Sequence, residues 1–144
     1  MPCKILPYED AKHRDRVVSL WITVFSYEAD HNAPELVIDK KLKFDDGLFF
    51  VAIDGQSVIG SVMAGYDGHR GWIYSMAVLP DYQKQGIGSS LLSYAESKLA
   101  ELGCMKINLQ IMEGNETVER FYKSNGYLTE KRISMGKQLR HNIT

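Results

Sequence analysis

The sequence predicts an α+β fold in which a mixed, mostly antiparallel central sheet carries helices on both faces. Residues 48–79 contain three apolar runs separated by tight turns, and residues 87–102 repeat leucines at helical spacing. Residues 105–111 then alternate apolar and polar side chains. Strands joined by tight turns are antiparallel neighbours. A strand–helix–strand unit of this length implies a right-handed crossover between parallel strands, which makes the sheet mixed.

Composition indicates one folded domain and excludes several classes of protein. A chain of 144 residues can bury its own core, so we expect a single domain over residues 1–144. The formal net charge is −1 and no basic run occurs, which argues against a nucleic-acid partner. No apolar stretch could span a bilayer, and residues 1–10 lack the apolar core of a signal peptide, so we expect no membrane association.

Cysteine usage indicates a reducing compartment. Cys3 and Cys104 are the only cysteines, and neither belongs to a CxxC pair or lies near a pair of histidines. The sequence therefore predicts no disulfide framework and no metal site, and a cytoplasmic location.

The first third of the chain predicts a short strand and two helices. A strand over residues 3–7 precedes a helix that Asp10 or Asp15 would cap. The helical spacing rests on Val17, Val18, Leu20, Trp21, Val24 and Phe25. Residues 26–34 are polar and irregular, and a second helix is expected from Pro34 to Phe44.

The middle third predicts three strands in succession. Residues 48–53 form a buried-strand run, and Asp54-Gly55 is a hairpin turn of the type that needs positive φ. Residues 58–66 are the second strand, residues 67–71 a turn, and residues 72–79 the third strand.

The last part changes period again. The apolar stripe of helix 87–102 consists of Ile87, Leu91, Leu92, Ala95, Leu99 and Leu102. Gly103 stands where a C-cap glycine belongs, and residues 105–111 follow as a strand. We expect a last helix from Asn115 to Gly126, and a closing strand or two over residues 127–139.

Gly86 and Gly88 lie between strand 72–79 and helix 87–102, which is where an anion can bind. The first N–H groups of a helix have no partner, and glycine lets the backbone approach a ligand closely. A charge-assisted hydrogen bond contributes about 1.5–3 kcal/mol, against roughly 0.3–1 kcal/mol for the helix dipole. Loop geometry should therefore matter more than nearby charges.

Three kinds of phosphate loop compete for this segment. A Walker loop needs Gly-Lys-Ser/Thr, but Ser89 and Ser90 follow Gly88. A Rossmann fingerprint needs a third small residue where Leu91 stands. The remaining pattern is Gln-x-x-Gly-x-Gly after a strand ending in Val-x-Pro, and residues 77–92 follow it. This stretch resembles the coenzyme-A loop of the GNAT superfamily of N-acetyltransferases.

The resemblance extends to roughly residues 48–128. Asn115, Phe121, Tyr122 and Gly126 match the superfamily's Asn-x-x-x-x-x-Phe-Tyr-x-x-x-Gly segment. Three further segments look like the bacterial YpeA-type branch, whose substrate the likeness does not carry over. They are residues 65–71, 103–107 and 134–137.

The resemblance implies acetyl-CoA as cosubstrate and assigns the residues that would bind it. Met76, Ala77 and Val78 would lend backbone groups to the pantetheine arm, with the Val78 N–H polarising the thioester carbonyl. Their other interpretation is that of core strand residues. The loop itself would bind the coenzyme through Gln83, Lys84, Gln85, Gly86, Ile87, Gly88 and Ser89. Asn115 would contact the coenzyme, cap its helix, or do both.

Tyr122 resembles the general acid of the superfamily, which protonates the departing thiolate. A model tyrosine has a pKa near ~10 and a thiol near ~8.5, so the proton moves only as the thiolate develops. The competing interpretation is a tyrosine packed beside Phe121.

The general base is not assigned by sequence. Ribosomal-protein acetylases of this superfamily carry a glutamate five residues before the motif asparagine, and Gln110 stands there in this chain. The conceivable bases are Glu28, Asp30, His31, His69 and Glu113. Tyr74 could help order a water. Lack of an obvious base leans toward an α-amine of pKa ~7.7–8.0 over a lysine of pKa ~10.4, or toward a water chain.

The sequence thus predicts an acetyl-CoA-dependent N-acetyltransferase that acts on a primary amine by direct attack. A small-molecule amine and a protein amine both remain open as acceptor. The alternatives are a non-catalytic coenzyme-A-binding regulatory module, which Gln110 keeps open, and a mainly structural role. A homodimer is also open, because superfamily members are often dimers.

Overall fold

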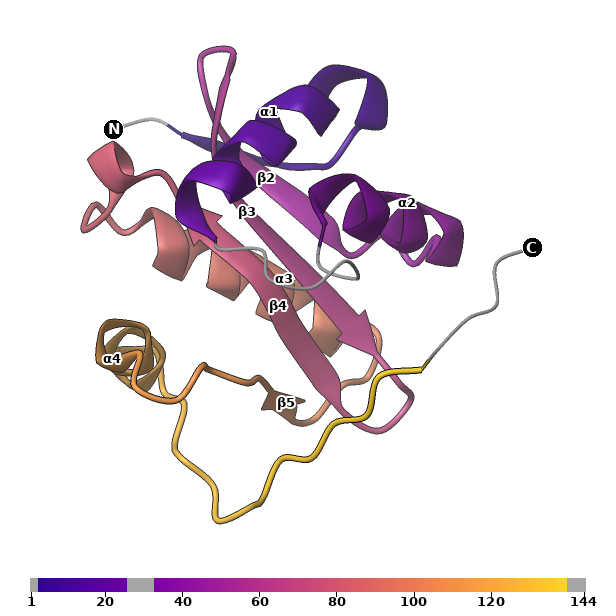
Figure 1. Cartoon of the computed structure of the whole chain (residues 1–144), viewed down its shortest axis with the longest axis vertical. Coiled ribbons are helices and arrows are strands. Elements are labelled where there is room, and N and C mark those ends of the chain that lie inside the picture. The colour runs from indigo at the N-terminus through magenta and orange to yellow at the C-terminus, as the bar shows by residue number, and fades with distance from the viewer. Residues whose placement is uncertain (1–2, 26–32, 140–144) are drawn as a thin grey trace. The chain divides into compact units, whose positions relative to one another are not determined.

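Five strands hydrogen-bond in the order in which they occur along the chain, β1-β2-β3-β4-β5 (Figure 1). Their bounds are β1 Lys4–Pro7, β2 Phe49–Asp54, β3 Ser57–Tyr66, β4 Gly71–Val78 and β5 Ile107–Asn108. The first four strands pair antiparallel, and β5 joins β4 in parallel. The mixed, mostly antiparallel sheet predicted from sequence is confirmed.

The computed structural model describes residues 3–25 and 33–139. The chain divides into two compact units, Met1–Gln110 and Ile111–Thr144. Among the described residues, the first unit contains the sheet, three α-helices and a short 3-10 helix (Pro80–Tyr82), and the second contains the last α-helix.

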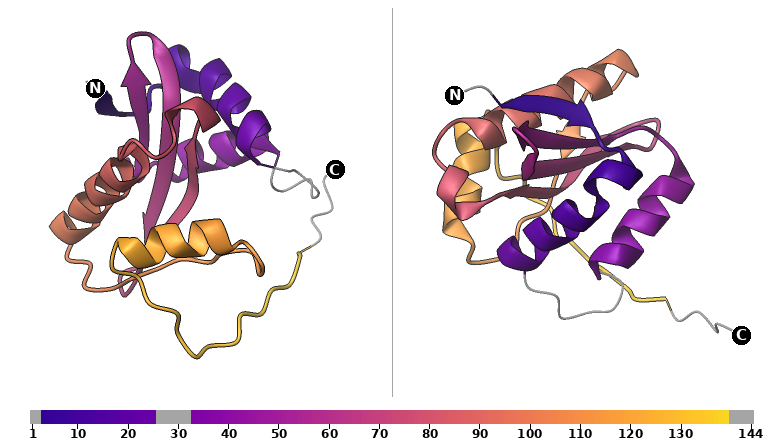
Figure 2. Two further views of the ribbon diagram at one scale, coloured as in Figure 1. Left: turned by 90° about the vertical axis from the view of Figure 1, so that its left-hand side faces the viewer. Right: turned by 90° about the horizontal axis from the view of Figure 1, so that it is seen from above.

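Helices of the first unit cover both faces of its sheet (Figure 2). Helices α1 (Asp10–Val24) and α2 (Pro34–Phe44) lie on one face, and α3 (Ile87–Glu101) lies on the other. The alternation of strand side chains explains this arrangement. A Cβ on Gly60 would meet Leu91 of α3 at 2.9 Å, whereas the next residue, Ser61, hydrogen-bonds to Trp21 of α1.

The core beneath α1 is an apolar cluster anchored by Trp21. Its indole is 1% exposed and stacks on Phe49 with ring centroids 5.9 Å apart. The buried members are Val17, Leu20, Trp21, Ile38, Phe49, Val51, Val58, Met63 and Ala77. Burial of this set attaches α1 and α2 to the sheet, since apolar burial is the main favourable term in folding.

The start of α1 differs from the prediction. Its N-cap is Glu9, whose N–H donates to Nδ1 of His13 at 2.9 Å. Asp10 instead accepts from the Tyr8 hydroxyl at 2.6 Å, and Asp15 lies inside the helix. The expectation that Asp10 or Asp15 caps α1 is wrong, because the helix already begins at Asp10, with Glu9 as its N-cap and no side chain capping its first N–H groups. The predicted start of α2 at Pro34 is confirmed.

The end of α3 agrees with the sequence, but β5 is shorter than expected. Gly103 has φ +94°, as a C-cap glycine should, whereas Leu102 lies just past the helix and is 54% exposed. The predicted strand over residues 105–111 is reduced to Ile107–Asn108. Alternation of side chains marks a segment that can pair, but β5 pairs with β4 only at Gly71 and Trp72 and leaves the rest of that edge open.

The second unit contains α4 (Glu116–Ser124), as predicted. The closing strand or two expected over residues 127–139 is wrong, since no strand is assigned there. Leu128, Ile133, Met135 and Leu139 are 72–91% exposed instead of buried. Among the described residues, the sheet pairs strands β1 to β5 only, and none of them pairs with a strand in this segment. No helix in residues 3–25 and 33–139 is long and apolar enough to cross a bilayer.

Candidate functional site

Strand β4 contains a bulge close to its carboxyl end. Ser61 pairs with Ala77 and Met63 with Tyr74, so Ser75 and Met76 together face a single residue of β3. Ser75 has φ +51°, a left-handed conformation that costs a non-glycine residue roughly 1–2 kcal/mol. Bulges of this kind commonly redirect backbone groups next to functional sites.

The edge of β4 that faces away from β3 is open beyond the bulge. Strand β5 pairs with β4 only at Gly71 and Trp72. The Leu79 N–H donates to the Ile59 carbonyl of β3 at 2.9 Å. Because successive residues of a strand direct their N–H groups to opposite edges, the N–H and C=O of Val78 point to the open edge. A ligand can therefore extend the sheet there.

The loop after β4 is fastened by its own glutamines. The side-chain amide of Gln83 donates to the Val78 carbonyl at 3.0 Å, and that of Gln85 donates to the Asp81 carbonyl at 3.3 Å. The Tyr82 hydroxyl reaches Asp54 at 3.0 Å, and this hydrogen bond raises the pKa of Tyr82. The side chains of Gln83 and Gln85 thus shape the loop and leave its backbone to face a ligand.

Helix α3 begins with unpaired donors. Gly86 is its N-cap at φ +83°, and Lys84 two residues earlier is also left-handed at φ +64°. The first helical hydrogen bond runs from the Ser90 N–H to the Gly86 carbonyl at 3.0 Å. The N–H groups of residues 87–89 precede it and have no acceptor within the helix. No side chain caps this end and no acidic residue occupies its first turn, so the site suits a phosphate.

Asn115 is the N-cap of α4. Its Oδ1 accepts from the Val118 N–H at 3.3 Å, and its carbonyl accepts from the Glu119 N–H at 3.1 Å. The capping interpretation of Asn115 is therefore confirmed.

Tyr122 is buried in the second unit, at 7% exposure. Its ring makes edge-on contacts with Phe121 and Tyr127, at centroid distances of 5.0 and 5.6 Å. Burial raises the pKa of Tyr122 to about 12, so its hydroxyl stays protonated at neutral pH. The packed environment expected from its position beside Phe121 is present, and it preserves the protonated form that an acid requires.

The conceivable bases fall in different places. Glu28, Asp30 and His31 lie outside the described residues. His69 lies in an exposed turn where its N–H donates to Asp67, and Glu113 is exposed. Gln110 is exposed and follows β5. Within the described part of the chain, no cluster of histidine, cysteine and acidic side chains could hold a metal ion.

Sequence reasoning missed a buried lysine beside β4. The Lys41 side chain is 7% exposed, and its Nζ donates to Asp46 at 2.9 Å, to the Tyr74 hydroxyl at 2.7 Å and to the Ala64 carbonyl. A lysine on a helix between other lysines carries no sequence signal of burial. The contact fixes the ring of Tyr74, which was expected to order a water.

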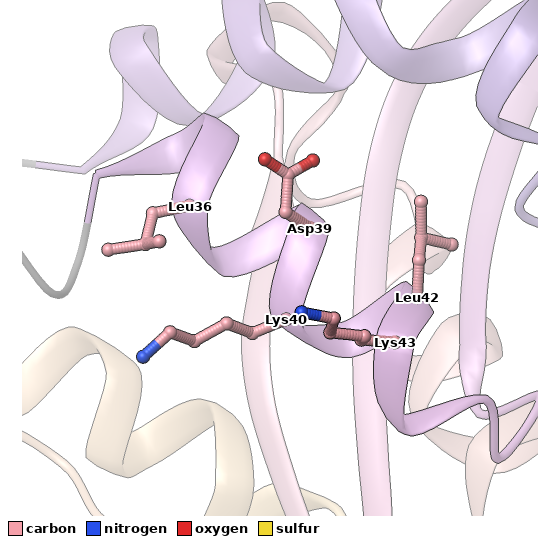
Figure 3. A pocket seen from close by; sticks show the side chains of 5 residues that line it. All are labelled: Leu36, Asp39, Lys40, Leu42 and Lys43. Atoms are coloured by element: carbon pink, nitrogen blue, oxygen red, sulfur yellow. The ribbon is translucent and has the colours of Figure 1, made fainter. Parts of the chain in front are cut away.

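The hollows of the first unit lie away from the loop. The larger one, of about 510 Å³, is bounded by α2 alone among the described residues (Figure 3). Its lining residues are Leu36, Asp39, Lys40, Leu42 and Lys43. Neither this hollow nor the one beside Tyr8 is lined by a described residue of 76–89. These two hollows thus do not belong to the candidate site, which consists of a backbone edge and a helix terminus.

Comparison with protein families gives one match over most of the chain. Residues 14–127 match the family model described as Acetyltransferase (GNAT) family. A protein named Acetyltransferase from Yersinia pestis (strain Pestoides F) is 44% identical over 108 residues, which cover 75% of this chain and 77% of the relative. A relative of Sodalis glossinidius with a similar name is 43% identical over 109 residues, with 75% and 77% covered.

Solved structures share the fold at low sequence identity. The PaiA N-acetyltransferase of Thermoplasma acidophilum, in complex with coenzyme A, aligns with a TM-score of 0.79 at 17% identity, covering 92% of this chain and 94% of that one. AAC(6')-Iy in complex with a bisubstrate analogue aligns with a TM-score of 0.77 at 14% identity, covering 97% and 100%. These likenesses concern the fold alone.

Proposed function

The chain belongs to the GNAT family of acetyltransferases, and from that premise we propose that it transfers acetyl from acetyl-CoA to a primary amine. The amine nitrogen attacks the thioester carbon directly, the C–S bond breaks, and an amide and coenzyme A leave. Coenzyme A in the complex of the PaiA enzyme, and in that of AAC(6')-Iy with CoA, supports this cosubstrate. The family match over residues 14–127 supports one functional domain made from both units.

The observation that carries the proposal is the open edge of β4 leading into the unpaired start of α3. Val78 directs its N–H to that edge, and residues 87–89 have N–H groups without a helical acceptor. A ligand with an extended amide arm followed by a diphosphate fits this sequence of donors. We assign the pantetheine arm to the backbone of Met76, Ala77 and Val78, and the diphosphate to the loop from Gln83 to Ser89.

Catalysis in this proposal depends on positioning and electrostatics. Binding both substrates supplies much of the acceleration by bringing nitrogen and thioester together. A backbone N–H at the open edge of β4, that of Val78 or of Met76, stabilises the charge that develops on the thioester oxygen. Tyr122 donates its proton to the sulfur as the C–S bond breaks; its raised pKa keeps the hydroxyl protonated until then and makes it a weaker acid than a free tyrosine. The proton of the attacking amine leaves to water, since Gln110 is an amide and cannot accept it.

The test is release of free thiol from acetyl-CoA by the purified chain. The panel of acceptors contains small primary amines, a peptide with a free α-amine, and a peptide whose only amine is a lysine side chain. Turnover with any of them supports the enzyme, and the active class identifies the acceptor. An acceptor with an α-amine should give a rate that rises toward pH 8, because its pKa is about 7.7–8.0.

The rival is a module that binds coenzyme A without turnover. Binding alone would raise the melting temperature in millimolar acetyl-CoA through linkage, while no amine releases thiol. Absence of both effects would contradict either function. Light scattering with and without coenzyme measures the molecular mass and so tests whether the protein is a homodimer. Membership of the YpeA-type branch is tested by comparing the acceptors that this protein and its relatives acetylate.

A further inference from the structure

A buried hydrogen-bond chain connects α1 to the bulge of β4. The indole Nε1–H of Trp21 donates to Oγ of Ser61 at 2.8 Å, and the Ser61 hydroxyl donates to the Ser75 carbonyl at 3.0 Å. Trp21 is 1% exposed and Ser61 is 0% exposed. The side chains of Trp21 and Ser61 are shielded from water, so each depends on a protein partner for its hydrogen bond, whereas Ser75 is half-buried.

The chemistry of the three groups decides which donates and which accepts. An indole N–H can only donate and a carbonyl can only accept. The Ser61 oxygen therefore accepts from Trp21, and its single proton must point to the Ser75 carbonyl. Trp21 thus removes the rotational freedom that the Ser61 hydroxyl would otherwise have.

These hydrogen bonds set the orientation of the Ser75–Met76 peptide group. No described peptide bond is cis, so the carbonyl of Ser75 and the N–H of Met76 point in opposite directions. The carbonyl is held toward Ser61 on β3. The Met76 N–H consequently points away from β3, to the same open edge as the Val78 N–H.

This peptide needs support because it lies in a disfavoured conformation. Ser75 adopts φ +51°, where residues other than glycine, asparagine and aspartate are uncommon. Left-handed residues persist only where the surroundings hold them. The hydrogen bond from the Ser61 hydroxyl to the Ser75 carbonyl is a contact that can hold Ser75 in this conformation.

We propose that Trp21 and Ser61 are positioning residues for acetyl transfer: they hold the Ser75–Met76 peptide so that the Met76 N–H donates to the thioester carbonyl of bound acetyl-CoA. This inference rests on the proposed function. Neither side chain touches the coenzyme, and both act through the peptide that they orient. A donor aimed in advance at a developing negative charge lowers the barrier, because it does not reorganise during the reaction.

The decisive variants alter the hydrogen bonds from Trp21 to Ser61 and from Ser61 to Ser75 with small changes in packing. Ser61→Ala removes the link, Ser61→Cys retains a weaker donor of similar size, and Trp21→Phe removes the indole donor together with part of the buried ring. Val17→Ala is the matched control. Val17 lies on α1 in the same apolar cluster as Trp21 and is 0% exposed, but its side chain takes no part in the Trp21–Ser61–Ser75 hydrogen bonds. All four variants are compared with the parent in melting temperature, kcat, and KM for acetyl-CoA.

Ser61→Ala should lower kcat on the order of tenfold, with KM for acetyl-CoA changed by no more than about twofold. Trp21→Phe should have a smaller effect of the same kind, and Ser61→Cys should recover part of the loss. Val17→Ala should lower the melting temperature without changing kcat. Equal kcat in Ser61→Ala and the parent would overturn the proposal, as would a loss in Val17→Ala that matches it at similar melting temperature.

A binding measurement keeps this inference separate from the proposed function. Free coenzyme A lacks the thioester carbonyl, so Ser61→Ala should weaken the affinity for acetyl-CoA relative to that for coenzyme A, within the twofold limit given for KM, while Val17→Ala leaves the ratio of the two affinities unchanged. This ratio is measurable even if no amine is acetylated. An unchanged ratio in Ser61→Ala contradicts the positioning role, whereas absence of turnover by the parent contradicts the proposed function.

Discussion

The ammonium of Lys41 donates to the Tyr74 hydroxyl at 2.7 Å and so connects α2 to β4. The same Nζ donates to the Asp46 carboxylate at 2.9 Å and lies 5.1 Å from the centroid of the Tyr74 ring. The side chains of Lys41 and Asp46 are only 7% and 18% exposed. This buried cation joins a carboxylate, a carbonyl and a hydroxyl. Its removal leaves Asp46 with the Leu48 N–H but no cation, and the Ala64 carbonyl with only the 3.4 Å hydrogen bond from Tyr74.

The first prediction concerns the contacts of Lys41 with Asp46 and Tyr74. Lys41→Met should reduce the free energy of unfolding by about 1–3 kcal/mol, because the half-buried Asp46 carboxylate loses its cation. Urea denaturation measures the change. Lys40→Met is the matched control, since Lys40 is exposed on the same helix and should alter stability by no more than about 0.5 kcal/mol. Equal stability of the two variants would show that Lys41 is not structurally important.

The second prediction concerns His13 at the start of α1. Its Nδ1 accepts from the Glu9 N–H, which requires the neutral ring, and burial lowers its pKa below the usual 6.5. The unfolded chain therefore binds a proton at a higher pH than the folded chain does. The stabilisation is complete above about pH 6.5 and is lost as the pH falls toward the folded pKa.

The measurement is the free energy of unfolding between pH 8 and pH 5. His13→Gln should show a shallower decline on acidification than the parent, because its amide oxygen can accept the hydrogen bond without titrating. His69→Gln, at an exposed turn, should decline as the parent does. A parent and a His13→Gln variant with the same pH dependence would contradict the role of His13.

The third prediction concerns the glycine at the start of α3. Gly86→Ala places a Cβ in open space but at φ +83°, which should cost roughly 1–2 kcal/mol of stability. It should also raise KM for acetyl-CoA several-fold, because relaxing this φ moves the N–H groups that would hold the diphosphate. Gly103→Ala is a close match at the other end of the same helix, with φ +94° and open space around its Cβ. It should lose similar stability while KM stays unchanged; a KM that rises equally in both would indicate a general effect of destabilising α3.

These residues show which parts of the molecule the sequence can predict. Strands β2 to β4 and helix α3 follow from local periodicity and from turns such as Gly55, which has φ +63°. Strand β5 and the segment 127–139 have similar patterns, but a strand also requires a pairing edge, which depends on residues distant in sequence. The Trp21–Ser61 hydrogen bond joins residues 40 positions apart, so the orientation of the Ser75–Met76 peptide could not be predicted from sequence. The loop from Gln83 to Ser89 could be predicted, because its glycines and its place between a strand and a helix are local features of the sequence.

The last prediction concerns Tyr122. Tyr122→Phe should retain binding of coenzyme A and lose kcat, since it removes the proton proposed for the departing thiolate and leaves the ring that packs against Phe121 and Tyr127. With a pKa of about 12, Tyr122 stays protonated across any practical assay range. The pH profile of kcat in the parent should therefore show no decline from its ionisation up to about pH 10. Tyr94→Phe is the control, because Tyr94 also packs edge-on against an aromatic ring, that of Phe50, in the first unit. If both variants keep the kcat of the parent, another group or water protonates the sulfur and Tyr122 is only a packing residue.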